Sequence, residues 1–285
     1  MWKLIWKWSD SMGNYVKGET YKITFANLKG GVGKSTSSVA LAYILGQLGF
    51  KVLAVDTDSQ CNLTTLFDRN PEEIDLSINE IMLEKNDINE CIIPDVEENV
   101  DLIASSPALS ILDMKIVSQF RREFILEDAF KKLNKKYDFI IFDTPPALNI
   151  TTLNVFICSD AIIVPSEADI LSLKAIDSLN DAVRMMSKVH DIKILGILLT
   201  RVERLRGDRI MMENSLKLAE LLNTKVFNTY IRAQKNVKES RLNNTNVVKY
   251  SIENRRKDKE DAGLDYERFA EELLNDLGVD INGKV

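Results

Sequence analysis

Short runs of apolar residues alternate along the chain with longer stretches in which apolar residues recur every three or four positions. The short runs are typical of strands buried on both faces, and the longer stretches are typical of amphipathic helices. Their alternation indicates an α/β fold, in which a mostly parallel, twisted sheet carries helices on both faces. The expected strands span residues 22–28, 51–56, 100–104, 139–143, 161–165, 193–200 and 225–229, and the expected helices span residues 33–48, 77–84, 107–118, 121–134, 170–188, 208–222 and 265–277.

The length and composition of the chain suit one large domain. Of the 285 residues 45% are hydrophobic, and we expect residues 21–285 to share a single core. Residues 1–20 form an N-terminal extension that contains all three tryptophans. This extension either packs on the domain and buries its tryptophans, or uses them to anchor a partner or a membrane surface. No apolar run of about eighteen residues is present, so no membrane span is predicted. The three dispersed cysteines favour neither a disulfide framework nor zinc, which indicates a reducing cytoplasm.

Charge is distributed unevenly around a formal net charge of −6. Residues 225–257, the basic segment, hold nine lysines and arginines against two glutamates, a local sum of +7, and acidic stretches lie on both sides (71–100 and 258–285). Such a segment indicates either a surface for nucleic-acid phosphates or ordinary solvated side chains that balance the acidic stretches. Its basic residues are Lys225, Arg232, Lys235, Lys238, Arg241, Lys249, Arg255, Arg256 and Lys257.

Residues 21–36 combine an apolar run with the glycine-rich sequence K-G-G-V-G-K-S-T. Its glycines let backbone N–H groups approach a phosphate, and a helix that begins near Lys34 points its positive dipole end at the same place. In a P-loop the lysine at this position reaches the β- and γ-phosphates, and the next hydroxyl, here Ser35, binds Mg²⁺. The sequence therefore predicts a nucleotide site. The expected nucleotide-binding residues of the loop are Lys29, Gly30, Gly31, Val32, Gly33, Lys34, Ser35 and Thr36.

The loop departs from the general P-loop pattern at its start. Leu28 stands where that pattern has glycine, and Lys29 precedes the glycines. With this early lysine the sequence resembles the deviant Walker A motif of the ParA/MinD family of P-loop ATPases. In that family the early lysine crosses a dimer interface to the phosphates of the other subunit's ATP. The resemblance, which covers most of residues 22–275, implies that Lys29 acts in trans and that both Lys29 and Lys34 serve catalysis.

Carboxylates follow two of the expected strands. Asp143 ends the apolar run F-I-I-F-D and precedes two prolines that stop the strand. It therefore lies at the carboxyl edge of the sheet, where a Walker B aspartate holds Mg²⁺. Asp56 and Asp58 follow the strand 51–56 and, two positions apart in an extended chain, point to the same side. The alternative for this pair is two solvated aspartates in a turn.

The segment V-D-T-D-S-Q around this pair resembles the switch segment of the same family, commonly D-x-D-P-Q, with Ser59 in place of the proline. The resemblance implies that Asp58 orients or deprotonates the attacking water, and that Asp56 supports the Mg²⁺ shell. By the same analogy, the loops around Thr200 and Arg232 contact the adenine.

Together these features imply an ATP hydrolase that requires ATP and Mg²⁺, closest to the ParA-type plasmid and chromosome partition ATPases. Such a protein forms a homodimer on ATP binding, binds DNA non-specifically, and hydrolyses ATP when a centromere-binding, ParB-like partner stimulates it. The resemblance thus implies a cytoplasmic protein that associates with the nucleoid when ATP is bound. A metabolic P-loop enzyme such as dethiobiotin synthetase is a more remote alternative.

The main alternative is a MinD-like membrane-cycling ATPase, which would need a basic amphipathic helix at its C-terminus. The expected helix 265–277 is acidic instead, so an anionic bilayer would repel it. We therefore expect its apolar stripe of Tyr266, Phe269, Leu273 and Leu277 to face the core, and no stable membrane association.

Overall fold

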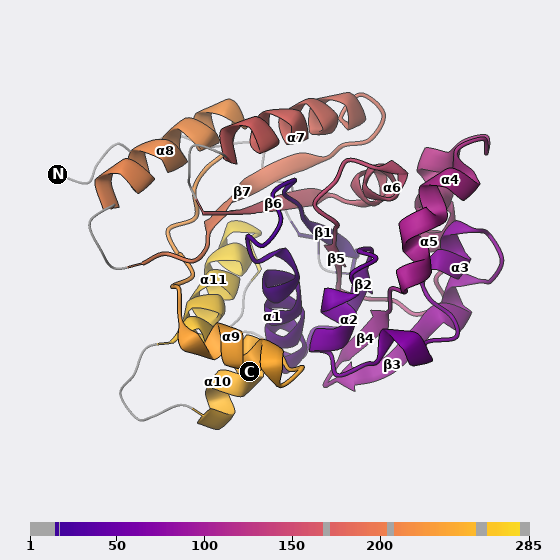
Figure 1. Ribbon diagram of the computed structural model, residues 1–285, viewed down its shortest axis with the longest axis horizontal. Coiled ribbons are helices and arrows are strands. Elements are labelled where there is room, and N and C mark those ends of the chain that lie inside the picture. The colour runs from indigo at the N-terminus through magenta and orange to yellow at the C-terminus, as the bar shows by residue number, and fades with distance from the viewer. Residues whose placement is uncertain (1–14, 17, 168–171, 204–207, 255–260, 280–285) are drawn as a thin grey trace.

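The computed structural model describes residues 15–16, 18–167, 172–203, 208–254 and 261–279. Within these ranges seven strands form one sheet, in the order β3-β4-β2-β5-β1-β6-β7 (Figure 1). Neighbouring strands are parallel except β3, which runs antiparallel to β4. This arrangement confirms the predicted α/β fold with a mostly parallel sheet. The strands are β1 (Tyr21–Phe25), β2 (Val52–Asp56), β3 (Ile92–Glu97), β4 (Val100–Ile103), β5 (Phe139–Asp143), β6 (Ala161–Ser166) and β7 (Lys193–Leu199).

Helices cover both faces of this sheet (Figure 1). The α-helices are α1 (Lys34–Gln47), α2 (Asn62–Leu66), α3 (Ile78–Met82), α4 (Leu112–Ile116), α5 (Ile125–Phe130), α6 (Ile150–Cys158), α7 (Ser172–Met186), α8 (Asp208–Leu221), α9 (Lys235–Leu242), α10 (Val247–Asn254) and α11 (Ala262–Asp276). On one face α1, α10 and α11 pack over the central strands in a single apolar core. On the other face α3 to α6 cover β2, β4 and β5, and α7 and α8 cover β6 and β7. The sheet is therefore buried on both sides, as its continuous apolar strands require.

The central strands bring three loops to one edge of the sheet. β5 lies between β1 and β2, and all three run in the same direction. In their register Asp143 at the end of β5 is level with Phe25 at the end of β1 and with Asp56 at the end of β2. The P-loop, the segment after β2 and the segment after β5 consequently begin side by side, at the edge where parallel α/β sheets bind ligands.

Residues 225–229 do not form the predicted strand. Val226 makes an isolated bridge with Ile197 of β7, whereas the backbone N–H groups of Asn228 and Thr229 donate to the Glu272 carboxylate on α11. The segment therefore satisfies part of its backbone through a side chain from a distant helix. Its apolar pattern reports the burial of Phe227, which does not by itself require a strand.

The strand β3 and the helix α6 were not predicted. β3 contains Pro94, which a strand tolerates at the edge of a sheet, where β3 lies. α6 has the sequence I-T-T-L-N-V-F-I-C, rich in β-branched residues that disfavour helices. It is stabilised instead by burial and by its N-cap, where the Asn149 side chain accepts from the Thr152 N–H at 2.9 Å. The predicted helices 107–118 and 121–134 are also interrupted, each being a 3₁₀ turn followed by a short α-helix.

The apolar stripe of α11 lies in the core, as predicted: Tyr266, Phe269, Leu273 and Leu277 are at most 2% exposed. Near the other end of the chain, the Tyr15 ring stacks on Phe139 with 5.3 Å between centroids. The three tryptophans lie outside the described residues. Among the helices that are described, none is long and apolar enough to cross a membrane.

Candidate nucleotide-binding site

The loop between β1 and α1 has the geometry of an anion-binding loop. Gly31 and Gly33 have φ angles of 79° and 91°, in the left-handed region where a side chain would be strained. Gly33 directly precedes α1, and no side chain among the described residues caps the helix there. The backbone N–H groups of its first turn therefore face the loop with the positive end of the helix dipole. The Thr36 hydroxyl in that turn is buried and has no hydrogen-bond partner within the described part of the chain.

Lys34 is a buried lysine, 7% exposed, whose Nζ donates to the Lys29 carbonyl at 3.3 Å. Burial lowers the pKa of its ammonium group, and the charges of Asp143 and Asp58 act in the opposite direction. A buried ammonium group is stable only with compensating negative charge. An anion in the loop would supply that charge, in agreement with the phosphate-binding role predicted for Lys34.

Asp56 and Asp143 are fully buried side by side at the ends of β2 and β5. Burial raises the pKa of Asp143 to about 8, with a further contribution from the charge of Asp56. Burial likewise raises the pKa of Asp56 to about 6, although hydrogen bonds from Thr64 oppose the shift. Two buried carboxylates this close are costly without a cation, so the pair is suited to a site that binds one.

The oxygens of Asp143 differ in their contacts. Oδ1 accepts from the Ser38 hydroxyl at 3.3 Å, whereas Oδ2 is buried and has no hydrogen-bond partner among the described residues. Ser35, the predicted metal ligand of the P-loop, is also buried. In the described ranges no cluster of three or more His, Cys, Asp or Glu side chains could hold a metal by itself. These residues fit Mg²⁺, which takes few protein ligands and completes its shell with phosphate oxygens and water.

Both oxygens of Asp56 are engaged in holding the segment after β2. Oδ1 accepts from the Asp58 N–H at 3.1 Å, and Oδ2 accepts from the N–H and the hydroxyl of Thr64 at 2.8 and 2.7 Å. The Asp58 carboxylate in turn accepts from the Gln60 N–H at 3.0 Å. Asp56 therefore anchors the loop that carries Asp58. Sequence reasoning did not single out Thr64, because a threonine eight residues after an aspartate matches no known motif.

Lys29 is held by a carboxylate of its own chain. Its Nζ lies 2.7 Å from Glu167 Oε2, and the other oxygen of Glu167 lies 2.8 Å from Arg201 Nη1. Arg201 reaches over the P-loop, since both of its terminal nitrogens lie 3.9 Å from the position of a Cβ atom added to Gly31. Neither Glu167 nor Arg201 was among the residues predicted for the nucleotide site.

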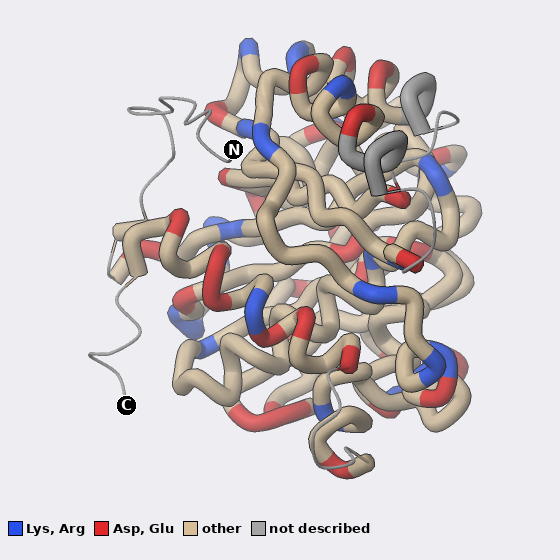
Figure 2. Tube along the Cα trace, turned by 90° about the vertical axis from the view of Figure 1, so that its left-hand side faces the viewer, with Lys and Arg blue, Asp and Glu red and all other residues tan. Residues whose placement is uncertain are grey.

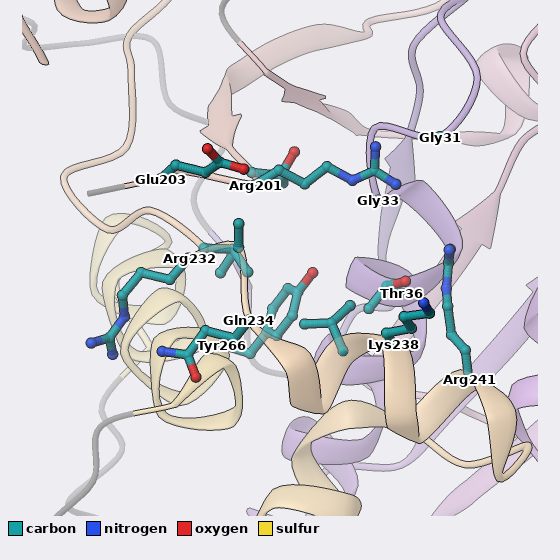
Figure 3. Close-up of a pocket in the computed structure, with 14 residues that line it drawn as sticks. Gly31, Gly33, Thr36, Arg201, Glu203, Arg232, Gln234, Lys238, Arg241 and Tyr266 are labelled. Carbon is teal, nitrogen blue, oxygen red and sulfur yellow. The ribbon is translucent and has the colours of Figure 1, made fainter. Parts of the chain in front are cut away.

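A cavity of about 310 Å³ opens beside the P-loop, between Gly31, Gly33 and Thr36 on one side and α9 on the other (Figure 3). Thr200 and Arg232, the residues predicted near the adenine, both line it. The Thr200 hydroxyl donates to the Val32 carbonyl at 2.8 Å and so fixes the loop. The Arg232 guanidinium turns away from the P-loop toward α11, where it pairs with Asp265 at 2.6 Å.

The basic segment is not one uniform cationic face. Figure 2 shows basic and acidic positions interspersed along the trace. Four of its basic residues form ion pairs: Lys225 with Asp276, Arg232 with Asp265, Lys235 with Glu239, and Lys249 with Glu97. Lys238 and Arg241 line the cavity beside the P-loop. Arg255, Arg256 and Lys257 lie outside the described residues.

A mostly parallel α/β sheet with a glycine-rich phosphate loop after β1, and buried aspartates at the ends of β5 and β2, defines a P-loop nucleotide-binding protein. Residues 20–195 match a family model described as an AAA domain. The sporulation initiation inhibitor protein Soj of Bacillus subtilis is 29% identical over 236 residues, which is 82% of this chain and 92% of Soj. The chromosome partitioning protein ParA of Myxococcus xanthus is 32% identical over 180 residues, 62% of this chain and 64% of that protein.

Among solved structures, a candidate plasmid partition protein of Borrelia burgdorferi bound to AMPPNP has a TM-score of 0.71 and 29% sequence identity. The match covers 90% of this chain and 99% of that one. The chain thus belongs to the ParA/MinD family of P-loop ATPases.

Proposed function

We propose that this protein is a ParA-type partition ATPase that binds ATP with Mg²⁺ and hydrolyses it as part of a DNA segregation system. The observation that carries the proposal is the loop K-G-G-V-G-K-S-T with Asp56, Asp58 and Asp143 buried at the same edge of the sheet. The names of the relatives point in the same direction, since they include a chromosome partitioning protein and a sporulation inhibitor.

The chain's own residues suggest how the work is divided. The P-loop backbone and Lys34 bind the phosphates, and Ser35 and Asp143 hold Mg²⁺, which neutralises charge on the phosphates when bound. Asp56 fixes the loop after β2 through Thr64 and the Asp58 N–H, and the Asp58 carboxylate, whose charge acts on Lys34, would orient the attacking water. Positioning of this kind, more than covalent chemistry, is what phosphoryl transfer requires of a protein.

Dimerisation, DNA and a partner complete the proposal. ATP would join two subunits face to face, with Lys29 of each subunit reaching the nucleotide of the other. The dimer would bind DNA without base specificity through basic residues, and would be associated with the nucleoid in that state. We assign the largest DNA contribution to Arg255, Arg256 and Lys257, because the sequence places these three cations next to one another, whereas four other residues of the basic segment would first have to leave a carboxylate. A centromere-binding, ParB-like protein would stimulate hydrolysis.

One assay tests the class of protein. ATP turnover is measured with Mg²⁺ for the protein alone, with random duplex DNA, and with the product of a small open reading frame next to its gene. Stimulation by DNA and that product together is the expected result. Turnover that responds to a small-molecule carboxylate acceptor and not to DNA would instead indicate a metabolic P-loop enzyme.

A further inference from the structure

One face of α9 lines the cavity beside the P-loop. Gln234, Val237, Lys238 and Arg241 all contribute to its wall, and their spacing of three, four and seven residues places them on the same face of a helix. Val237 packs against the core. Lys238 and Arg241 extend from α9 toward the start of α1, where Thr36 lies (Figure 3). The cavity therefore has cationic side chains on the wall that faces the phosphate loop.

Lys238 and Arg241 differ from the other cations nearby in having no carboxylate partner. Arg201 and Arg232 line the same cavity, but each forms an ion pair, with Glu167 and Asp265 respectively. Within the described residues, no carboxylate oxygen lies within 4.0 Å of the nitrogens of Lys238 or Arg241. Both side chains are exposed and thus accessible to a ligand. In a chain with a net charge of −6, two unpaired cations that converge on one cavity indicate an anionic ligand.

We propose that Lys238 and Arg241 bind the phosphate chain of the nucleotide that the P-loop holds. The inference rests on the proposed function and adds a second wall to its site. The P-loop offers backbone N–H groups and the helix dipole from one side, and α9 offers two full charges from the other. The Arg241 guanidinium can hold two phosphate oxygens at once, while the Lys238 ammonium acts as a point charge.

DNA phosphates have the same chemistry, and both residues belong to the basic segment. The geometry favours the nucleotide, because the two side chains share a cavity with Gly31, Gly33 and Thr36. A cavity of about 310 Å³ has the size of a small-molecule pocket, and a DNA duplex does not fit in it.

The test measures ATP affinity by calorimetry, with Mg²⁺ and without DNA, for wild type, Lys238→Gln, Arg241→Gln and the double variant. Each single substitution should weaken binding roughly 10-fold and the double substitution up to roughly 10²-fold, as charge-assisted hydrogen bonds are lost. Added salt should weaken ATP binding less in the double variant than in wild type. Lys235→Gln is the matched control, since it removes the same charge from the same helix outside the cavity, and it should leave the affinity unchanged. Lys238→Arg keeps the charge and should retain binding, which separates a phosphate contact from an effect on folding.

The outcomes separate the inference from the proposed function. If the double variant binds ATP as wild type does while Lys34→Ala does not, the inference is overturned and the ATPase assignment stands. If that double variant has also lost binding to random duplex, the phosphates that the two residues recognise are those of DNA. If wild type itself binds no ATP, the proposed function and the inference both fail.

Discussion

Lys29 and Glu167 form an ion pair within one chain, with 2.7 Å between Nζ and Oε2. The same carboxylate also holds Arg201, at 2.8 Å. A lysine that reaches the nucleotide of a facing subunit must first leave this acceptor. In the proposed dimer, Glu167 would compete with the phosphates of the facing nucleotide for the Lys29 ammonium group.

This competition predicts that Glu167→Gln lowers the ATP concentration needed for dimerisation. The pair is about one quarter exposed, so the shift should be several-fold, not many orders of magnitude. Light scattering against ATP concentration, in an Asp58→Ala background that limits hydrolysis, measures it. Glu220→Gln removes the same charge from α8, which contributes no residue to this ion pair, and should have no effect. A Glu167→Gln variant that needs as much ATP as wild type would show that the ion pair does not restrain Lys29.

Lys29→Ala should abolish ATP-dependent dimerisation but leave the ATP affinity of the monomer measurable. The reason is that Lys34 already serves the phosphates of its own subunit. Light scattering and calorimetry on the same preparation separate the two properties. A Lys29→Ala protein that still dimerises on ATP would assign Lys29 to its own subunit.

Substitutions at Lys34 and Asp58 should affect different steps, ATP binding and ATP hydrolysis respectively. Lys34→Ala removes the buried cation of the phosphate loop and should abolish ATP binding. Asp58→Ala leaves that loop intact, so it should bind ATP and Mg²⁺ but turn over at least ~10²-fold more slowly. Calorimetry gives the affinities, and phosphate release gives the rates. Turnover by Asp58→Ala at the wild-type rate would mean that another group positions the water, with Gln60 the next residue to test.

The parts of the site that follow a local rule could be predicted from sequence. Glycines before Lys34 and an aspartate at the end of a buried strand have fixed places in an α/β sheet, so their residue types and order suffice. Glu167, Thr64 and Arg241 follow no such rule. Their importance comes from side chains that meet across the fold, and a single sequence does not encode those distances.

The same distinction explains the fold. The interior strands β2, β5 and β6 are buried at every position and were predicted, whereas β3 at the edge of the sheet has a mostly exposed or partly exposed pattern. The predicted strand 225–229 failed because its apolar pattern rests on Phe227, which alone among these residues is fully buried, and because Glu272 satisfies two of its backbone N–H groups. The periodicity of apolar residues predicts which side chains are buried, but it does not predict the hydrogen-bond partners of the backbone groups.

The buried carboxylate Asp143 makes the stability of the ligand-free protein depend on pH. Its pKa is about 8 in the folded chain and about 3.9 in an unfolded one. A raised pKa favours folding at low pH, and this contribution is lost as the pH rises from about 4 to about 8. Asp143→Asn removes the titration, so its melting temperature should exceed that of wild type by a few degrees at pH 8 and by little at pH 4.5. Scanning calorimetry without nucleotide or Mg²⁺ measures both.

Asp101→Asn is the contrasting control. Burial alone would raise the pKa of Asp101, but hydrogen bonds from Lys135 and Tyr137, at 2.6 and 2.7 Å, lower it overall. Its contribution to stability is therefore present above the unfolded pKa and lost as the pH falls. The variant should melt below wild type at pH 8, with a smaller deficit at acid pH. Equal pH profiles for Asp143→Asn and wild type would contradict the burial argument.

DNA binding should depend on the run Arg255, Arg256 and Lys257 more than on the ion-paired residues of the basic segment. A lysine that already neutralises a carboxylate of its own chain, such as Lys249 with Glu97, must break that pair before it gains a phosphate. Each cation that meets a phosphate releases about one counterion, so affinity should fall steeply with salt and show little preference for base sequence. Replacing all three residues of the run by glutamine should therefore weaken ATP-dependent binding to random duplex and flatten its salt dependence. Lys249→Gln should change the affinity and the salt dependence much less.

Gel shifts at two salt concentrations measure the affinity and its salt dependence, and light scattering checks that every variant still dimerises on ATP. If the triple variant binds duplex as wild type does, the contact surface lies elsewhere on the dimer, and if wild type shows no ATP-dependent binding, DNA is not a partner of this protein.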